Sequence, residues 1–176
     1  DVDKFIETVK AIAPTFGGIN LEDIKAPEAF EIETRLKEEL DIPVMHDDQH
    51  GTAIISAAAL KNAIEISGKD ITKLKIIVNG AGAAAISCTR LYLELGAVRE
   101  NIIMCDSKGV IRKDRDNLTS QKAEFATHQD VNTLEEAMQN ADVFIGLSTG
   151  NIVSPEMLLS MGKNPIVFAM ANPVPE

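Results

Sequence analysis

Aromatic residues are scarce in this 176-residue chain, at 4% of the composition, and tryptophan is absent. Surfaces that stack single-stranded nucleic acid are built from such rings, so the scarcity argues against that function. Basic residues are also in the minority: 17 Lys and Arg stand against 27 Asp and Glu. The net charge of −10 opposes phosphate backbones and anionic lipids, so we expect neither a nucleic-acid nor a membrane partner.

Cysteines and long apolar runs are few as well. The two cysteines, Cys88 and Cys105, lie in apolar segments, which favours reduced packing residues over a disulfide and is typical of a cytoplasmic protein. The most apolar stretch, residues 53–60, is far shorter than the roughly 20 residues of a membrane span. The charged opening residues already fit a helix, so no secretory leader is expected. Hydrophobic residues at 45% and charged residues at 25% are typical of a globular core.

Helical and strand patterns alternate along most of the chain. Apolar residues at helical spacing predict helices over 2–13, 27–40, 51–66, 82–95, 119–126, 133–139 and 154–161. Short apolar runs predict strands over 74–78, 101–105, 143–147 and 165–171, and the polar stretch 108–117 is expected to be a surface loop. Strands separated by helices imply right-handed βαβ units. We therefore expect an α/β fold with a Rossmann-like, doubly wound parallel sheet over 51–176, preceded by a shorter helix-and-strand segment over 1–50.

A glycine-rich turn lies between the first of these strands and the next helix. Gly80 permits a tight turn, Gly82 lets a pyrophosphate approach the backbone, and Ala85 is small enough for the helix to pack on the strand. Asp106 follows at the end of the next strand, where an acid holds the adenine ribose hydroxyls of NAD. Ser107 and Lys108 would suit a 2′-phosphate, so NADP remains an alternative to NAD. A plain strand-to-helix turn that binds nothing is the competing interpretation.

Two pairs of adjacent acids each follow an apolar segment. Glu22 and Asp23 form the first pair, and Asp47 and Asp48 form the second. Carboxylates that converge at strand ends repel one another unless a cation or a proton intervenes, and oxygen ligands suit Mg²⁺ or Mn²⁺. Solvated loop acids or helix-capping acids would leave the same pattern. The two histidines that flank the second pair would favour zinc as ligands, but hydrogen bonding is the better interpretation.

Six segments taken in order resemble malic enzyme, the decarboxylating malate dehydrogenase, in its shorter bacterial form. They are GGINLEDI (17–24), APE (26–28), PVMHDDQHGTA (43–53), NGAGAA (79–84), DVFIGLS (142–148) and ANPVPE (171–176). The resemblance implies oxidation of malate by NAD, or NADP, followed by decarboxylation to pyruvate with Mg²⁺ or Mn²⁺. It also implies that residues 1–50 belong to the substrate- and metal-binding region and residues 51–176 to the dinucleotide-binding domain.

The same resemblance assigns roles to individual residues. The implied metal ligands are Glu22, Asp23 and Asp48, with Asp47 as a catalytic-site acid that orients the ligands or a catalytic lysine. The implied cofactor residues are Thr52, Gly80, Gly82, Ala83, Ala84, Asp106, Gly146, Leu147, Ser148 and Asn172. Asn172 is also the implied contact of the substrate carboxylate.

The chain departs from the family pattern at the catalytic acid and base. In the family, a lysine base and a tyrosine acid lie in a segment before the position of Gly17, and neither has a counterpart here. We therefore expect an internal segment of a longer enzyme that binds cofactor but does not turn over malate by itself. Family resemblance suggests a homodimer or a higher assembly. A malolactic decarboxylase, an amino-acid dehydrogenase and a non-catalytic dinucleotide-binding module are the alternatives.

Overall fold

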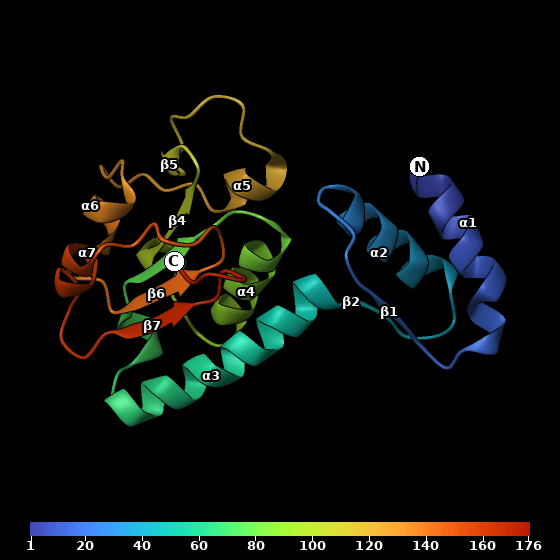
Figure 1. Ribbon diagram of the computed structural model, residues 1–176, viewed down its shortest axis with the longest axis horizontal. Helices are drawn as coiled ribbons and strands as arrows, with labels where there is room; N and C mark the ends of the chain where they lie inside the picture. The colour runs from blue at the N-terminus through green and yellow to red at the C-terminus, as the bar shows by residue number, and fades with distance from the viewer.

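The computed structural model describes residues 1–176, which are arranged around two separate sheets (Figure 1). The smaller sheet belongs to the N-terminal part, whose elements are α1 (Val2–Ile12), β1 (Ile19–Leu21), α2 (Glu28–Glu39) and β2 (Val44–His46). β1 pairs in parallel with β2, with Ile19 opposite Val44 and Leu21 opposite His46. A small apolar core lies between these elements and includes Ile6, Ile32 and Leu36. The pairing brings the chain after β1 beside the chain after β2.

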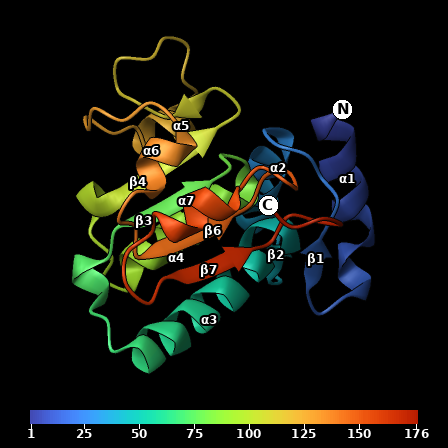
Figure 2. The same cartoon turned by 60° about the vertical axis from the view of Figure 1, so that its left-hand side comes forward.

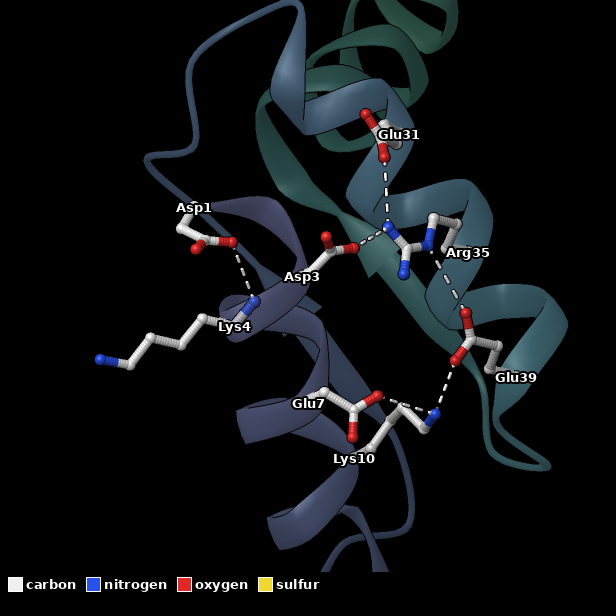
Figure 3. Close-up of polar contacts among 8 residues, drawn as sticks. All are labelled: Asp1, Asp3, Lys4, Glu7, Lys10, Glu31, Arg35 and Glu39. Atoms are coloured by element: carbon white, nitrogen blue, oxygen red, sulfur yellow. Dashed lines mark hydrogen bonds and ion pairs between the residues drawn. The ribbon is translucent and has the colours of Figure 1, made fainter.

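Charged side chains join the outer faces of α1 and α2 (Figure 3). Arg35 of α2 lies 2.7 Å from Asp3 of α1 and 3.5 Å from Glu39, and Lys10 of α1 lies 2.7 Å from the same Glu39. The Lys10, Arg35 and Glu39 side chains are about one-third exposed and Asp3 is 81% exposed, and solvent-accessible ion pairs contribute only about 0–1 kcal/mol. The apolar core therefore holds the two helices together, and the charges mainly set their register.

The larger sheet has the strand order β5-β4-β3-β6-β7. Its strands are β3 (Ile76–Asn79), β4 (Ile102–Asp106), β5 (Gly109–Val110), β6 (Val143–Gly146) and β7 (Ile166–Ala169). β3, β4, β6 and β7 run parallel, which confirms the predicted Rossmann-like α/β fold. β5 is antiparallel to β4 and lies in the stretch expected to be a loop. Gly109, the first residue of β5, has φ of +100°, a conformation that favours glycine.

Both faces of the larger sheet are covered by helices (Figure 2). These helices are α3 (Thr52–Ser67), α4 (Ala83–Glu94), α5 (Ser120–Glu124), α6 (Leu134–Met138) and α7 (Pro155–Leu159). Alternate strand residues point to opposite faces, so Ile76 and Val78 join the core with α3 and α4, and Ile77 joins the core with α6. Burial on both faces explains why the strands are continuously apolar. None of the helices combines the length and the apolar character that crossing a bilayer requires.

Short helical turns complete the chain, at η1 (Ala13–Thr15), η3 (Ile71–Lys73) and η4 (Arg99–Asn101), with a π-helical turn, η2 (Asp47–Gly51). Cys88 and Cys105 are free and buried, as predicted. Tyr92 lies in the core, where its hydroxyl donates to Ser56 Oγ over 2.9 Å. Burial raises the pKa of Tyr92 and the pKa of the Cys88 thiol, so both groups are neutral packing residues.

Candidate cofactor and metal site

An open cavity of about 870 Å³ lies at the carboxyl ends of β3, β4 and β6. Ligands of open α/β sheets bind at this edge, where the strand order reverses. Among the residues expected to bind cofactor, those that line the cavity are Gly80, Gly82, Asp106, Leu147 and Ser148. Those that lie outside its lining are Thr52, Ala83, Ala84, Gly146 and Asn172. Sequence reasoning missed Asn79 and Thr149, which also line it.

The two glycines of the turn differ in what they permit. Gly80 has φ of +127°, and a Cβ there would collide with the carbonyl oxygen of Leu147. Gly82 is the N-cap of α4, and a Cβ there would meet no atom within 4 Å. No side chain caps this helix end, so its backbone N–H groups are available to an anion. Gly80 therefore shapes the turn, and Gly82 leaves open space in front of the helix N-terminus.

The carboxylate of Asp106 is already paired with cations on the protein. Arg115 donates to both of its oxygens, at 3.0 and 3.1 Å, and Lys122 lies 2.7 Å from Oδ2. Burial alone would raise the pKa of Asp106, but these hydrogen bonds outweigh it and lower the pKa to about 2. The role of Asp106 as the residue that binds the ribose hydroxyls stays a prediction. In that role Asp106 would bind the ribose while paired with two cations, Arg115 and Lys122, that sequence reasoning did not identify.

Three carboxylates from the smaller sheet converge. Oxygens of Glu22, Asp47 and Asp48 all lie within 4.8 Å of one another. Two members of the expected ligand set, Glu22 and Asp48, belong to this group together with Asp47, and the role of Asp23 as a ligand stays a prediction. Asp23 adopts φ of +57°, and its backbone N–H donates to Asp48 Oδ2 over 3.0 Å. The pairing of β1 with β2 explains the convergence, since it places residues 22–23 next to residues 47–48.

The chemistry around these carboxylates fits a divalent cation. Three carboxylate ligands at adjustable distances suit Mg²⁺ or Mn²⁺, with water or substrate completing the coordination. Gly51 leaves the space that the Asp47 carboxylate occupies, because a Cβ there would collide with it. His46 is fully buried, both of its ring nitrogens lack a hydrogen-bond partner, and its Nε2 lies 3.9 Å from Asp48 Oδ2. A polar ring buried without partners beside three acids indicates a group that a bound species completes.

His50, the second histidine of the motif, contacts Glu33, an acid that sequence reasoning missed. His50 Nε2 lies 2.8 Å from the carboxylate of Glu33 on α2, and the His46 backbone N–H donates to the same carboxylate over 3.1 Å. Burial raises the pKa of Glu33, but hydrogen bonds from Lys37 and His50 lower it by more. The hydrogen-bonding interpretation of His50 is thus confirmed. The sequence signal that could have identified Glu33 is its place on the apolar face of α2, next to Ile32.

These features define a class of protein: an α/β protein with a dinucleotide-type turn at the carboxyl edge of its sheet and an oxygen-rich group suited to a divalent metal. Within that class the chain belongs to the malic enzyme family. The family model described as malic enzyme, NAD binding domain, matches residues 49–176. The model described as malic enzyme, N-terminal domain, matches residues 1–37.

Individual relatives agree with this assignment. The chain is 55% identical over 177 residues to an NADP-dependent malic enzyme of Rhizobium meliloti, covering 100% of this chain and 23% of the relative. It is 52% identical over 181 residues to a bifunctional malic/malolactic enzyme of Bacillus subtilis, covering 100% of this chain and 44% of the relative. The chain thus spans about a quarter of the first relative and less than half of the second.

Solved structures show the same similarity. The Entamoeba histolytica malic enzyme matches with a TM-score of 0.95 and 42% identity, over 100% of this chain and 38% of that one. An NAD-dependent malic enzyme from Thermotoga maritima matches with a TM-score of 0.93 and 43% identity, over 100% of this chain and 48% of that one. The fold of the chain is therefore that of the malic enzymes over its full extent.

Proposed function

We propose that this chain carries the cofactor and metal sites of an enzyme that converts (S)-malate to pyruvate and CO₂ with reduction of NAD or NADP. The observation that carries the proposal is the convergence of Glu22 with Asp47 and Asp48, two residues of η2, a segment that packs against α4. The N-terminus of α4 opens into the 870 Å³ cavity. In this proposal residues 1–50 supply the metal and substrate region, and residues 51–176 supply the dinucleotide region.

The proposed reaction divides the work among these residues. Glu22, Asp23 and Asp48 would hold a divalent cation, with Asp47 beside them to orient the ligands or a catalytic lysine. When bound, the cation supplies Lewis-acid polarisation of the substrate oxygen and stabilises the enolate left by decarboxylation. The Asp23 N–H fixes the orientation of Asp48. The Gly80–Gly82 turn and the first turn of α4, including Ala83 and Ala84, bind the pyrophosphate with backbone N–H groups.

The remaining proposed contacts lie at the exits of the strands. Leu147 and Ser148 position the nicotinamide so that the hydride from C2 of malate reaches it. Asn172 binds the substrate carboxylate or the nicotinamide ribose, and Thr52 lies near the cofactor. The lysine and the tyrosine that serve the family as base and acid are to be found in sequence beyond this chain. We accordingly expect no malate turnover from residues 1–176 alone.

We further propose that the site accepts NADP at least as well as NAD. The sequence alone favoured NAD, because a carboxylate repels a 2′-phosphate. The charge balance around Asp106 supports NADP. Arg115 and Lys122 pair with Asp106, and Lys108 lines the same cavity as Lys122. Three cations against one carboxylate give this corner a positive balance that suits a 2′-phosphate.

Metal binding tests the core of the proposal. Titration calorimetry with Mn²⁺ should show one site in the chain, and Glu22→Ala or Asp48→Ala should weaken binding at least tenfold because each removes one carboxylate ligand. Asp41→Ala is the matched control, since Asp41 is an exposed acid shortly before the same strand β2. If the parent chain binds no Mn²⁺, or if Asp41→Ala weakens binding as much as Asp48→Ala, the metal site is not where we place it.

A malolactic outcome is the second candidate, and the name of the Bacillus subtilis relative, a bifunctional malic/malolactic enzyme, motivates it. The two reactions share the oxidation and decarboxylation of malate but differ in whether pyruvate is released or reduced again. An assay of the full-length protein for free NADH or NADPH and pyruvate, against lactate, separates them. A non-catalytic binding module would give neither product.

We also propose a homodimer or higher homo-oligomer as the working state. Ile55 and Ile66 lie about three turns apart on one side of α3 and are 67% and 88% exposed. Apolar side chains this exposed are common at subunit interfaces. Light scattering on the full-length protein tests the assembly, and a strictly monomeric enzyme with full activity would contradict it.

A further inference from the structure

A buried acid outside the two sites joins the ends of two strands. Glu176 is 8% exposed, and its carboxylate accepts hydrogen bonds from the backbone N–H groups of Ser148, at 2.9 Å, and Ala171, at 3.0 Å. Its side chain lies against Gly146, where a Cβ would collide with the carboxylate. The missing side chain of Gly146 therefore leaves the space that the Glu176 carboxylate fills.

The two backbone donors occupy equivalent places on neighbouring strands. Ser148 lies two residues after the end of β6, and Ala171 lies two residues after the end of β7. The strands pair up to Gly146 opposite Ala169, and the Met170 N–H still donates to the Gly146 carbonyl over 3.1 Å. Beyond that point Ser148 and Ala171 no longer bond to each other's strand. The two oxygens of Glu176 bridge their N–H groups instead and hold the two strand exits apart.

This bridge is connected to the wall of the cofactor cavity. Ser148 Oγ accepts a hydrogen bond from Asn79 Nδ2 over 2.7 Å, and Asn79 directly precedes Gly80 of the glycine turn. Leu147, whose N–H donates to the Asn79 carbonyl over 2.8 Å, lines the cavity together with Ser148. A shift of the Ser148 backbone would therefore move one wall of the cavity, while Asp106 and Lys122 at its other end would stay in place.

We propose that Glu176 is a positioning residue that sets the spacing between the β6 and β7 exits for the nicotinamide half of the cofactor. The inference rests on the proposed function, because it requires a nicotinamide dinucleotide in the cavity. A carboxylate serves because it accepts at both oxygens, whereas an amide of the same size accepts at one and presents a donor to the other N–H. The adenine half depends on the glycine turn and the Asp106 corner, neither of which contacts Glu176.

The experiment compares two variants at opposite ends of β6 in the full-length protein. Glu176→Gln removes one of the two acceptors at the carboxyl end. Asp142→Asn is the matched control at the other end, where Asp142 accepts from the Lys75 N–H at 3.0 Å and from Lys69 Nζ at 2.6 Å. For both variants, the melting temperature is measured together with the affinities for NAD, NADP and ADP-ribose, which lacks the nicotinamide ring.

We expect both variants to lose melting temperature but only Glu176→Gln to lose dinucleotide affinity, by roughly tenfold, with ADP-ribose binding unchanged within twofold. Unaltered dinucleotide affinity in Glu176→Gln, or an equal loss for ADP-ribose, would overturn the inference and leave the proposed function intact. A parent protein that binds neither dinucleotide would overturn both. If Glu176→Gln does not fold, Glu176→Asp takes its place. It keeps both acceptors but is one methylene shorter, so it changes the spacing of the two strand exits and must still show the selective loss.

Discussion

Carboxylates lie at strand ends in two places in this molecule, a single acid in one and three acids in the other, and the two places differ in how the negative charge is balanced. Asp106, at the end of β4, is paired with Arg115 and Lys122. Glu22, Asp47 and Asp48 lie within 4.8 Å of one another, and no lysine or arginine forms an ion pair with them. Like charges that close repel each other unless a cation or a proton lies among them. Asp106 is thus compensated by cations of the chain itself, whereas the proposed function assigns a bound cation to the other three acids.

The largest expected effect is the stabilisation of the chain when a metal ion binds at Glu22, Asp47 and Asp48. Mn²⁺ at about 100 times its dissociation constant should stabilise the chain by about 2.7 kcal/mol, because only the folded state brings the three acids together. Thermal unfolding with and without Mn²⁺ measures this, and a chelator should reverse it. Asp48→Asn should abolish the gain. A metal-induced shift that survives in Asp48→Asn would show that the ion binds elsewhere.

The next largest expected effect is the loss of stability when the ion pairs of Asp106 with Arg115 and Lys122 are removed. The pKa of Asp106 is lowered from its usual 3.8 to about 2, so its ion pairs stabilise the folded state above pH 4. That stabilisation, about 2 kcal/mol, is lost as the pH falls from 4 towards 2. Asp106→Asn should therefore lower the free energy of unfolding by about that amount at pH 7 in urea titrations, and the difference from the parent should shrink as the pH falls towards 2.

Asp114→Asn provides the control for this measurement. Asp114 is also paired with an arginine, Arg112, but its side chain is 66% exposed. Solvent screening makes such exposed pairs weak, so we expect a much smaller loss than for Asp106→Asn. Equal losses in the two variants would mean that the burial of Asp106 does not matter.

The smallest expected effect is a change in the relative affinity for NADP and NAD when a cation beside Asp106 is removed. Lys122→Gln removes one of the cations beside Asp106 and should weaken NADP binding roughly tenfold, or about 1.4 kcal/mol, while NAD changes by less than twofold. Lys113→Gln removes the same charge from outside the cavity and should change neither affinity. Fluorescence titration with both dinucleotides checks this. Equal losses for NAD and NADP in Lys122→Gln would argue against a 2′-phosphate site here.

Sequence reasoning reached the elements of the larger sheet because their signals are local. The run at Ile76 to Asn79 is apolar at every position but the last, and glycines follow it directly, so strand, turn and helix are visible in one short stretch. β5 escaped prediction because a two-residue strand has no periodicity and exists only by pairing with β4. Glu33 and Glu176 escaped because a single acid shows no sign of burial until the backbone groups that it binds are in place.

The order of apolar and polar residues by itself determined the α/β class, the glycine turn and the presence of two acidic pairs, since each depends on neighbours within a few positions. Tertiary structure alone decided which acids meet. Glu22, Asp47 and Asp48 come together because the pairing of β1 with β2 places the residues after each strand side by side. The same holds for Asp106, whose partners Arg115 and Lys122 come from segments 9 and 16 residues further along. Contacts between separate segments depend on the folded path of the chain, which no local pattern records.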